Sequence, residues 1–133
     1  MPHVCLLGDS VFDNSAYVPG NPDVAQQLSD ELGESSSVTL LAVDGSITRE
    51  VAEQIGGVPR ACTHMVLSSG GNDVLNLIQV LDQPTPTVGH GLGLLSSYVD
   101  SFREEYRALL RGFCQNSDHR SPTGREAPSP SCV

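Results

Sequence analysis

Three short apolar runs in the first half of the chain each end at a turn motif that contains glycine. The runs cover residues 3–7, 37–43 and 64–68. The motifs that follow them are Gly8-Asp9-Ser10, Val43-Asp44-Gly45-Ser46 and Gly70-Gly71-Asn72-Asp73. Short apolar runs bounded by turn residues are typical of strands that are buried in a parallel sheet. We therefore expect three consecutive strands, each with polar groups at its carboxyl end.

The segments between these runs have the spacing of helices. In residues 23–32 the apolar positions Val24, Leu28 and Leu32 lie on one helical face, and Gly33 suits the position after the last turn. Further helices are expected over residues 49–55, 74–81 and 97–111, the last ending at Gly112. Strands that alternate with helices indicate an α/β fold with right-handed crossovers. Sites in such folds lie at the carboxyl ends of the strands.

Composition limits the classes of protein to consider. A chain of 133 residues, 38% apolar and 17% charged, is typical of one soluble domain. Its net charge of −9 argues against nucleic acid and anionic membranes as partners. The first residues do not resemble a signal peptide, and no run approaches the roughly 18 apolar residues of a membrane span, so we expect a cytoplasmic protein.

The last part of the chain differs in composition. Residues 114–133 contain mostly polar residues and proline and have no apolar periodicity. Such a segment buries too little surface to offset its ordering entropy. We therefore expect a folded domain over residues 1–113 and a disordered tail over residues 114–133.

Ser10, Gly45 and Asn72 are the candidate functional residues of the three motifs. Ser10 follows a strand and a turn, a place from which its hydroxyl can act as a nucleophile and its N–H can bind an oxyanion. The missing side chain of Gly45 lets a substrate approach the backbone N–H, and the Asn72 amide can donate a hydrogen bond. Taken singly, each has an ordinary alternative: a helix N-cap serine, a strand-end turn and an Asn-Asp turn.

The order and content of these motifs resemble the SGNH hydrolases, the GDSL esterase/lipase family. In that family Gly-Asp-Ser carries the nucleophile, here Ser10 preceded by Asp9, and the later blocks supply the rest of the oxyanion hole, here Gly45 and Asn72. The resemblance implies a three-layer α/β/α sandwich with a flavodoxin-like sheet of strand order 2-1-3-4-5, of which about three strands are present. It also implies hydrolysis of a small-molecule carboxylic ester through an acyl-enzyme, without metal or organic cofactor.

The chain departs from the family at the block that supplies the general base. The family places Asp-x-x-His late in the sequence, and no such motif occurs here. The nearest match is residues 116–119, Asn-Ser-Asp-His, which makes His119 one candidate base, and His90 in a glycine-rich segment is another. His3 and His64 begin strands and are expected at the opposite end of the sheet.

We therefore expect a C-terminally truncated hydrolase whose activity is impaired. One alternative is an inactive module that binds an acyl or acetyl group, or a gene remnant. A flavodoxin-like phosphate or cofactor binder fits less well, because the chain has no glycine-rich phosphate loop and the strand ends are acidic. The incomplete sheet would leave an edge open to self-association.

Overall fold

A computed structural model describes residues 1–118, which form three strands and four α-helices. The strands are β1 (His3–Gly8), β2 (Ser37–Leu40) and β3 (His64–Ser68). The helices are α1 (Val24–Leu32), α2 (Thr48–Gln54), α3 (Gly71–Leu81) and α4 (Val88–Asp118), and two 3-10 turns are η1 (Ser15–Tyr17) and η2 (Ile55–Gly57).

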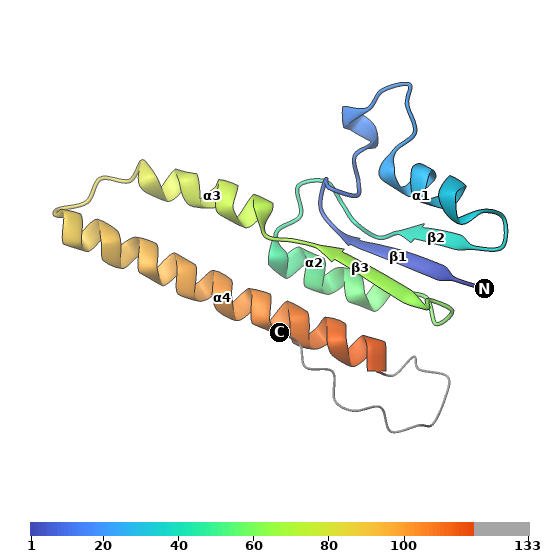
Figure 1. The fold of residues 1–133 in the computed structure, drawn as a ribbon. Coiled ribbons are helices and arrows are strands. Elements are labelled where there is room, and N and C mark those ends of the chain that lie inside the picture. The colour runs from blue at the N-terminus through green and yellow to red at the C-terminus, as the bar shows by residue number, and fades with distance from the viewer. Residues whose placement is uncertain (119–133) are drawn as a thin grey trace.

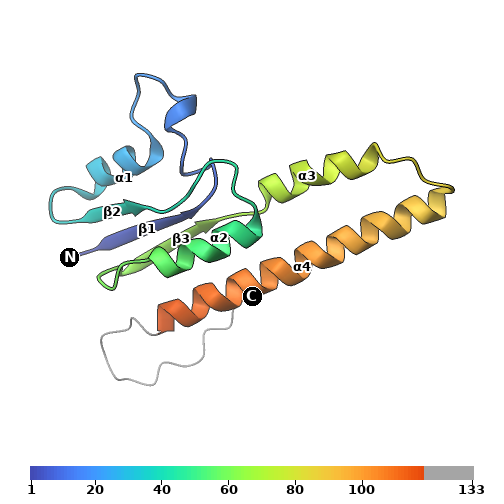
Figure 2. The ribbon, with the colours of Figure 1, turned by 180° about the vertical axis from the view of Figure 1, so that it is seen from behind.

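The three strands form a parallel sheet in the order β2-β1-β3, with β1 in the centre. The chain crosses from β1 to β2 in one direction and returns past β1 to β3. Right-handed crossovers in opposite directions place α1 and α2 on opposite faces of the sheet, as the two views in Figures 1 and 2 show. The expected α/β class is confirmed, and so is the parallel sheet.

The core lies between the central strand and the layer that contains α2 and the second half of α4. Cys5 and Leu7 of β1 are fully buried there, and Val58 and Cys62 complete the cluster. Neighbouring side chains that pack against it include Ile55, Met65, Leu67 and Phe113. Because Cys5 and Leu7 alternate along β1, their side chains point to the same face of the sheet.

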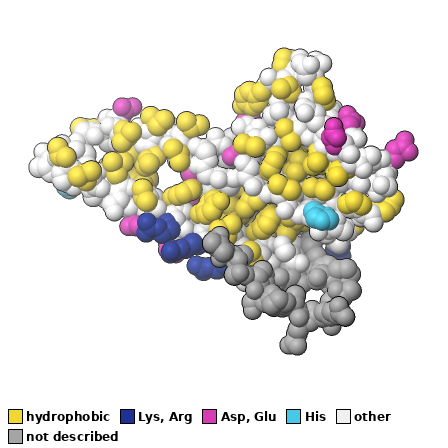
Figure 3. Space-filling model, viewed as in Figure 1, with side chains coloured by type: hydrophobic (Ala, Val, Ile, Leu, Met, Phe, Trp, Pro, Cys, Tyr) yellow, Lys and Arg dark blue, Asp and Glu magenta, His cyan; other side chains and the backbone are white. Residues whose placement is uncertain are grey.

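Helices α3 and α4 form an antiparallel hairpin that extends beyond the sheet (Figure 1). Only the second half of α4 packs on α2, where Leu109 is fully buried. Helix α3 and the first half of α4 expose many large apolar side chains, and Figure 3 shows several groups of hydrophobic side chains on this hairpin. These residues are Val74, Leu75, Ile78, Leu81, Val88, Leu92, Tyr98 and Val99.

The second strand is shorter than the sequence predicts. It ends at Leu40 instead of residue 43, because the N–H groups of both Leu41 and Ala42 donate to the carbonyl of Leu6. Two residues facing one partner make a bulge, which interrupts the ladder. Pairing resumes at Val43, whose N–H donates to the Gly8 carbonyl over 3.1 Å.

The last helix is longer than the sequence predicts, and it continues past residue 113, where the folded domain was expected to end. Helix α4 covers Val88–Asp118 instead of residues 97–111, and Gly112 lies inside it. A Cβ at Gly112 would lie 3.4 Å from the Ile55 Cδ1 atom, so the glycine marks a close packing contact and not a helix end. Residues 114–118, which we expected in the tail, are therefore helical, and the rest of that tail lies outside the described residues.

Gly8 is the position at which a side chain should be tolerated least. Its φ is +144°, and a Cβ there would collide with the Ser68 carbonyl oxygen of β3. We expect Gly8→Ala to lower the free energy of unfolding by about 3 kcal/mol. The matched control is Gly20→Ala: Gly20 also has positive φ, at +78°, but nothing lies within 4 Å of its Cβ position. Urea denaturation of both variants measures the difference, and equal losses would contradict a clash at Gly8.

Candidate active site

The chain makes one helical turn directly after β1. The N–H groups of Phe12 and Asp13 donate to the Asp9 carbonyl over 3.1 and 3.0 Å, and the N–H of Val11 donates to the buried Asp9 carboxylate over 3.1 Å. Among the described residues, neither the N–H nor the hydroxyl of Ser10 has a hydrogen-bond partner. Every buried side-chain polar atom in this part of the chain has a partner, so the Ser10 hydroxyl must reach solvent.

The loop after β2 presents a second backbone N–H. The N–H of Asp44 donates to the Asp13 carboxylate over 2.8 Å, and the N–H of Ser46 donates to the Val43 carbonyl over 3.1 Å. The N–H of Gly45, which lies between them, has no acceptor within residues 1–118. Gly45 has a φ of +82°, a left-handed conformation that favours glycine.

Asn72 lies in the first turn of α3, because this helix begins at Gly71 instead of residue 74 as predicted. Its side-chain Nδ2 donates one hydrogen bond to the Ser46 carbonyl over 3.0 Å. An amide nitrogen carries two hydrogens, and the second has no acceptor in the described part of the chain. The Asn72 amide therefore reaches back to the loop that carries Gly45 and does not point into the core.

Gln54, at the end of α2, joins the first two motifs, and sequence reasoning missed it. Its Oε1 accepts the N–H of Gly8 over 2.8 Å, and its Nε2 donates to the Gly8 carbonyl over 2.9 Å. The same Nε2 donates to the Ser46 hydroxyl over 3.4 Å. Ser46 thus receives hydrogen bonds from both Gln54 and Asn72. A lone glutamine in a helix carries no sequence signal of such contacts.

Thr48 of α2, which is buried, and Asp73 of α3 form a second link between these helices. The Thr48 N–H and hydroxyl both donate to the Asp73 carboxylate, over 2.9 and 2.8 Å to its Oδ2 atom. The Thr48 hydroxyl also lies 3.0 Å from the Ser69 hydroxyl. Thr48 is the first residue of α2, and the N–H of Ile47, which precedes the helix, donates to Glu50 over 3.0 Å. Thr48 holds two site loops together instead of capping its own helix.

These contacts bring together the ends of the three strands and the loops that follow them. Gly8 and Val43 are joined by a backbone hydrogen bond. Gly8 lies two positions before Ser10, and Val43 lies two positions before Gly45, so the bond holds these two predicted oxyanion donors near each other. Asn72 bonds to the residue that follows Gly45. The arrangement places a solvent-accessible hydroxyl and hydrogen-bond donors without internal acceptors on loops that are linked to one another.

The structure does not bring His90, one of the two candidate bases, to this site. His90 lies in the first turn of α4, at the end of the hairpin that is remote from the sheet (Figure 1). His3 and His64 lie at the amino ends of β1 and β3, where their rings contact Thr39 and Thr63. No histidine of residues 1–118 therefore lies at the carboxyl end of the sheet. His119 lies outside the described residues.

A shallow cavity of about 630 Å³ borders the Gly45 loop on its α2 side. Its acidic lining residues are Asp44, Glu50 and Glu53. Ser10 and Asn72 do not line this cavity. The region beside Gly45 is therefore negatively charged.

No family model, no curated protein and no solved structure matches this chain. Within residues 1–118, no helix has the length and apolar character needed to cross a membrane. No group of three or more His, Cys, Asp or Glu residues in that part of the chain is placed to hold a metal ion.

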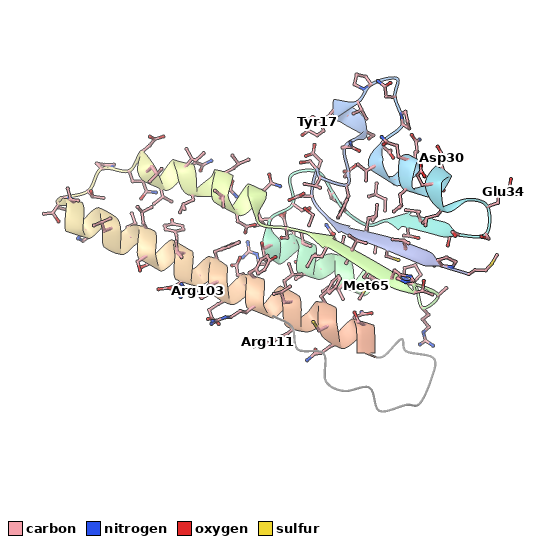
Figure 4. The ribbon with its side chains drawn as sticks, viewed as in Figure 1. Tyr17, Asp30, Glu34, Met65, Arg103 and Arg111 are labelled. Carbon is pink, nitrogen blue, oxygen red and sulfur yellow. The ribbon has the colours of Figure 1, made fainter. Side chains whose placement is uncertain are left out.

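Tyr17 forms a hydrogen bond to the loop after β2. Its hydroxyl donates to the Asp44 carboxylate over 2.8 and 3.0 Å, and Figure 4 shows it on the segment that stands above the sheet. This hydrogen bond, followed by the negative charges of Asp44 and Asp13, raises the Tyr17 pKa above its ordinary value of 10.0. The contact therefore persists at neutral pH and is lost only as pH rises through the raised pKa.

We expect Asp44→Asn to lower the Tyr17 pKa towards its ordinary value, because the charged acceptor is removed. Asp30→Asn, on the exposed surface of α1, should leave it unchanged. NMR titration of the Tyr17 Cζ resonance measures both effects, with Tyr98 and Tyr106 as internal references. A Tyr17 pKa that responds equally to both substitutions would contradict the contact with Asp44.

Proposed function

We propose that this domain carries the nucleophile and the oxyanion hole of an SGNH-type ester hydrolase that acts on small carboxylic esters. One observation carries the proposal. Three donors from neighbouring loops have no internal acceptor among residues 1–118: the N–H of Ser10, the N–H of Gly45 and one amide hydrogen of Asn72. Unused donors on tightly linked loops are the feature that an oxyanion hole requires.

In the proposed reaction the Ser10 Oγ attacks the carbonyl carbon of the ester and transfers its proton to a base. The carbonyl oxygen becomes an oxyanion, which accepts hydrogen bonds from the three donors. The tetrahedral intermediate then expels the alcohol, and water releases the acid from the acyl-serine. Gln54 and Asn72 support this step because their bonds to Gly8 and Ser46 fix the donor loops before the substrate arrives.

Residues 1–118 do not supply a histidine as the general base of this mechanism. No histidine of the described residues lies at the carboxyl end of the sheet, so Ser10 has no partner there to take its proton. This observation favours a second candidate function, a module that holds a carbonyl group with the same three donors and does not turn it over. A serine-reactive fluorophosphonate probe separates the two, since only an activated Ser10 reacts with it.

We expect residues 1–133 to hydrolyse p-nitrophenyl acetate slowly, at roughly 10³–10⁴ times the rate in water, from the oxyanion hole and binding alone. Ser10→Ala should change this rate little. Asn72→Ala should lower it at least about tenfold, because one oxyanion donor is lost. Asn21→Ala, at an exposed asparagine of another loop, is the control and should have no effect.

Two outcomes of this assay would change the interpretation. Fast turnover that disappears in Ser10→Ala would support Ser10 as the nucleophile and would show that the chain does hold a base. A rate that is unaffected by Asn72→Ala, with the fold intact by circular dichroism, would show that Asn72 is not an oxyanion donor.

A further inference from the structure

We propose that a cavity between α3, α4 and the start of α2 binds the neutral acyl chain of the ester, an inference that rests on the proposed function. The cavity has a volume of about 360 Å³, within the usual range for small-molecule sites. Most of its lining is apolar, contributed by Ile47, Val74, Leu77, Val99 and Phe102.

Two lining residues of the cavity are sequence neighbours of residues at the proposed oxyanion hole. Its lining residue Ile47 directly follows Ser46, and its lining residue Asp73 directly follows Asn72. The 3.0 Å bond from the Asn72 amide to the Ser46 carbonyl therefore lies beside one wall of the cavity. A carbonyl group held by Asn72 would have its chain within reach of this apolar space.

Phe102 gives this cavity a defined wall at its inner end. The position of a Cβ on Gly70 lies 3.4 Å from the Phe102 Cζ atom, so the ring sits directly against the backbone that begins α3. The Phe102 and Tyr106 rings also pack together, with 5.7 Å between their centroids. Apolar ligands bind best where the lining side chains are already positioned, because less conformational entropy is lost on binding.

The charges at the cavity select a neutral ligand. Its charged lining residues are Asp73 and Glu105, and it has no lysine, arginine or histidine among its lining residues. The Asp73 carboxylate accepts the hydrogen bonds of the Thr48 N–H and hydroxyl. An ester can enter this site without charge repulsion, whereas the carboxylate released by hydrolysis would face two carboxylates of the protein.

The test compares methyl hexanoate with hexanoate on the full chain at pH 7. We expect saturable binding of the ester, observed as NMR shifts of the Leu77 and Val99 methyl groups, and at least tenfold weaker binding of the acid. Val99→Glu adds a charge at an exposed lining position and should weaken binding of the ester at least tenfold. The matched control is Val88→Glu, on the same helix but outside this cavity, which should not change it.

Glu105→Gln tests the charge argument separately. It should strengthen binding of hexanoate about threefold or more and leave the ester unchanged, because one repelling carboxylate is removed. The absence of saturable ester binding, equal effects of Val99→Glu and Val88→Glu, or equal affinities for ester and acid would each overturn the inference. Binding needs no turnover, so a failure of this inference can be distinguished from a failure of the Asn72→Ala assay.

Discussion

The close approach of β1 to β3 at Gly8 is the constraint on which the rest of the site depends. The backbone of Gly8 is paired with Ser68, accepts the N–H of Val43 and is bound twice by the Gln54 amide. Any side chain at Gly8 would displace the Ser68 carbonyl and separate β3 from β1. The third motif begins two residues after Ser68, so the same displacement would move Asn72 away from the other two loops.

Polar side chains then fix loops that the sheet alone would leave independent. Ser46 accepts hydrogen bonds on its carbonyl from Asn72 and on its hydroxyl from Gln54. Thr48 and Asp73 add a partly buried link in which a carboxylate accepts two donors of Thr48, an interaction worth about 1.5–3 kcal/mol for each hydrogen bond to a charged group. Every buried side-chain polar atom of the described residues is satisfied, which is the condition under which such a network stabilises one conformation.

Local sequence signals predicted the strands and their turns, but not the contacts that cross the molecule. The apolar runs and glycine motifs mark strand positions because burial and backbone geometry act over a few residues. Gly112 was misread as a helix end: its cost in a helix is about 1 kcal/mol, and packing against Ile55 offsets it. Gln54 lies 46 positions from Gly8, and no periodicity or spacing records a bond between side chains so distant in sequence.

The site divides into an acidic side and an apolar side that meet at the bond between Ser46 and Asn72. Asp44, Glu50 and Glu53 lie on the first side, and the α3–α4 cavity lies on the second. In the proposed reaction the substrate is neutral and one product is an anion. The anion would leave a site whose charged lining residues are acidic on both sides, in a domain whose net charge is strongly negative. Repulsion between like charges therefore weakens binding of the product relative to the substrate, and the acidic composition of the chain acts in the direction of product release.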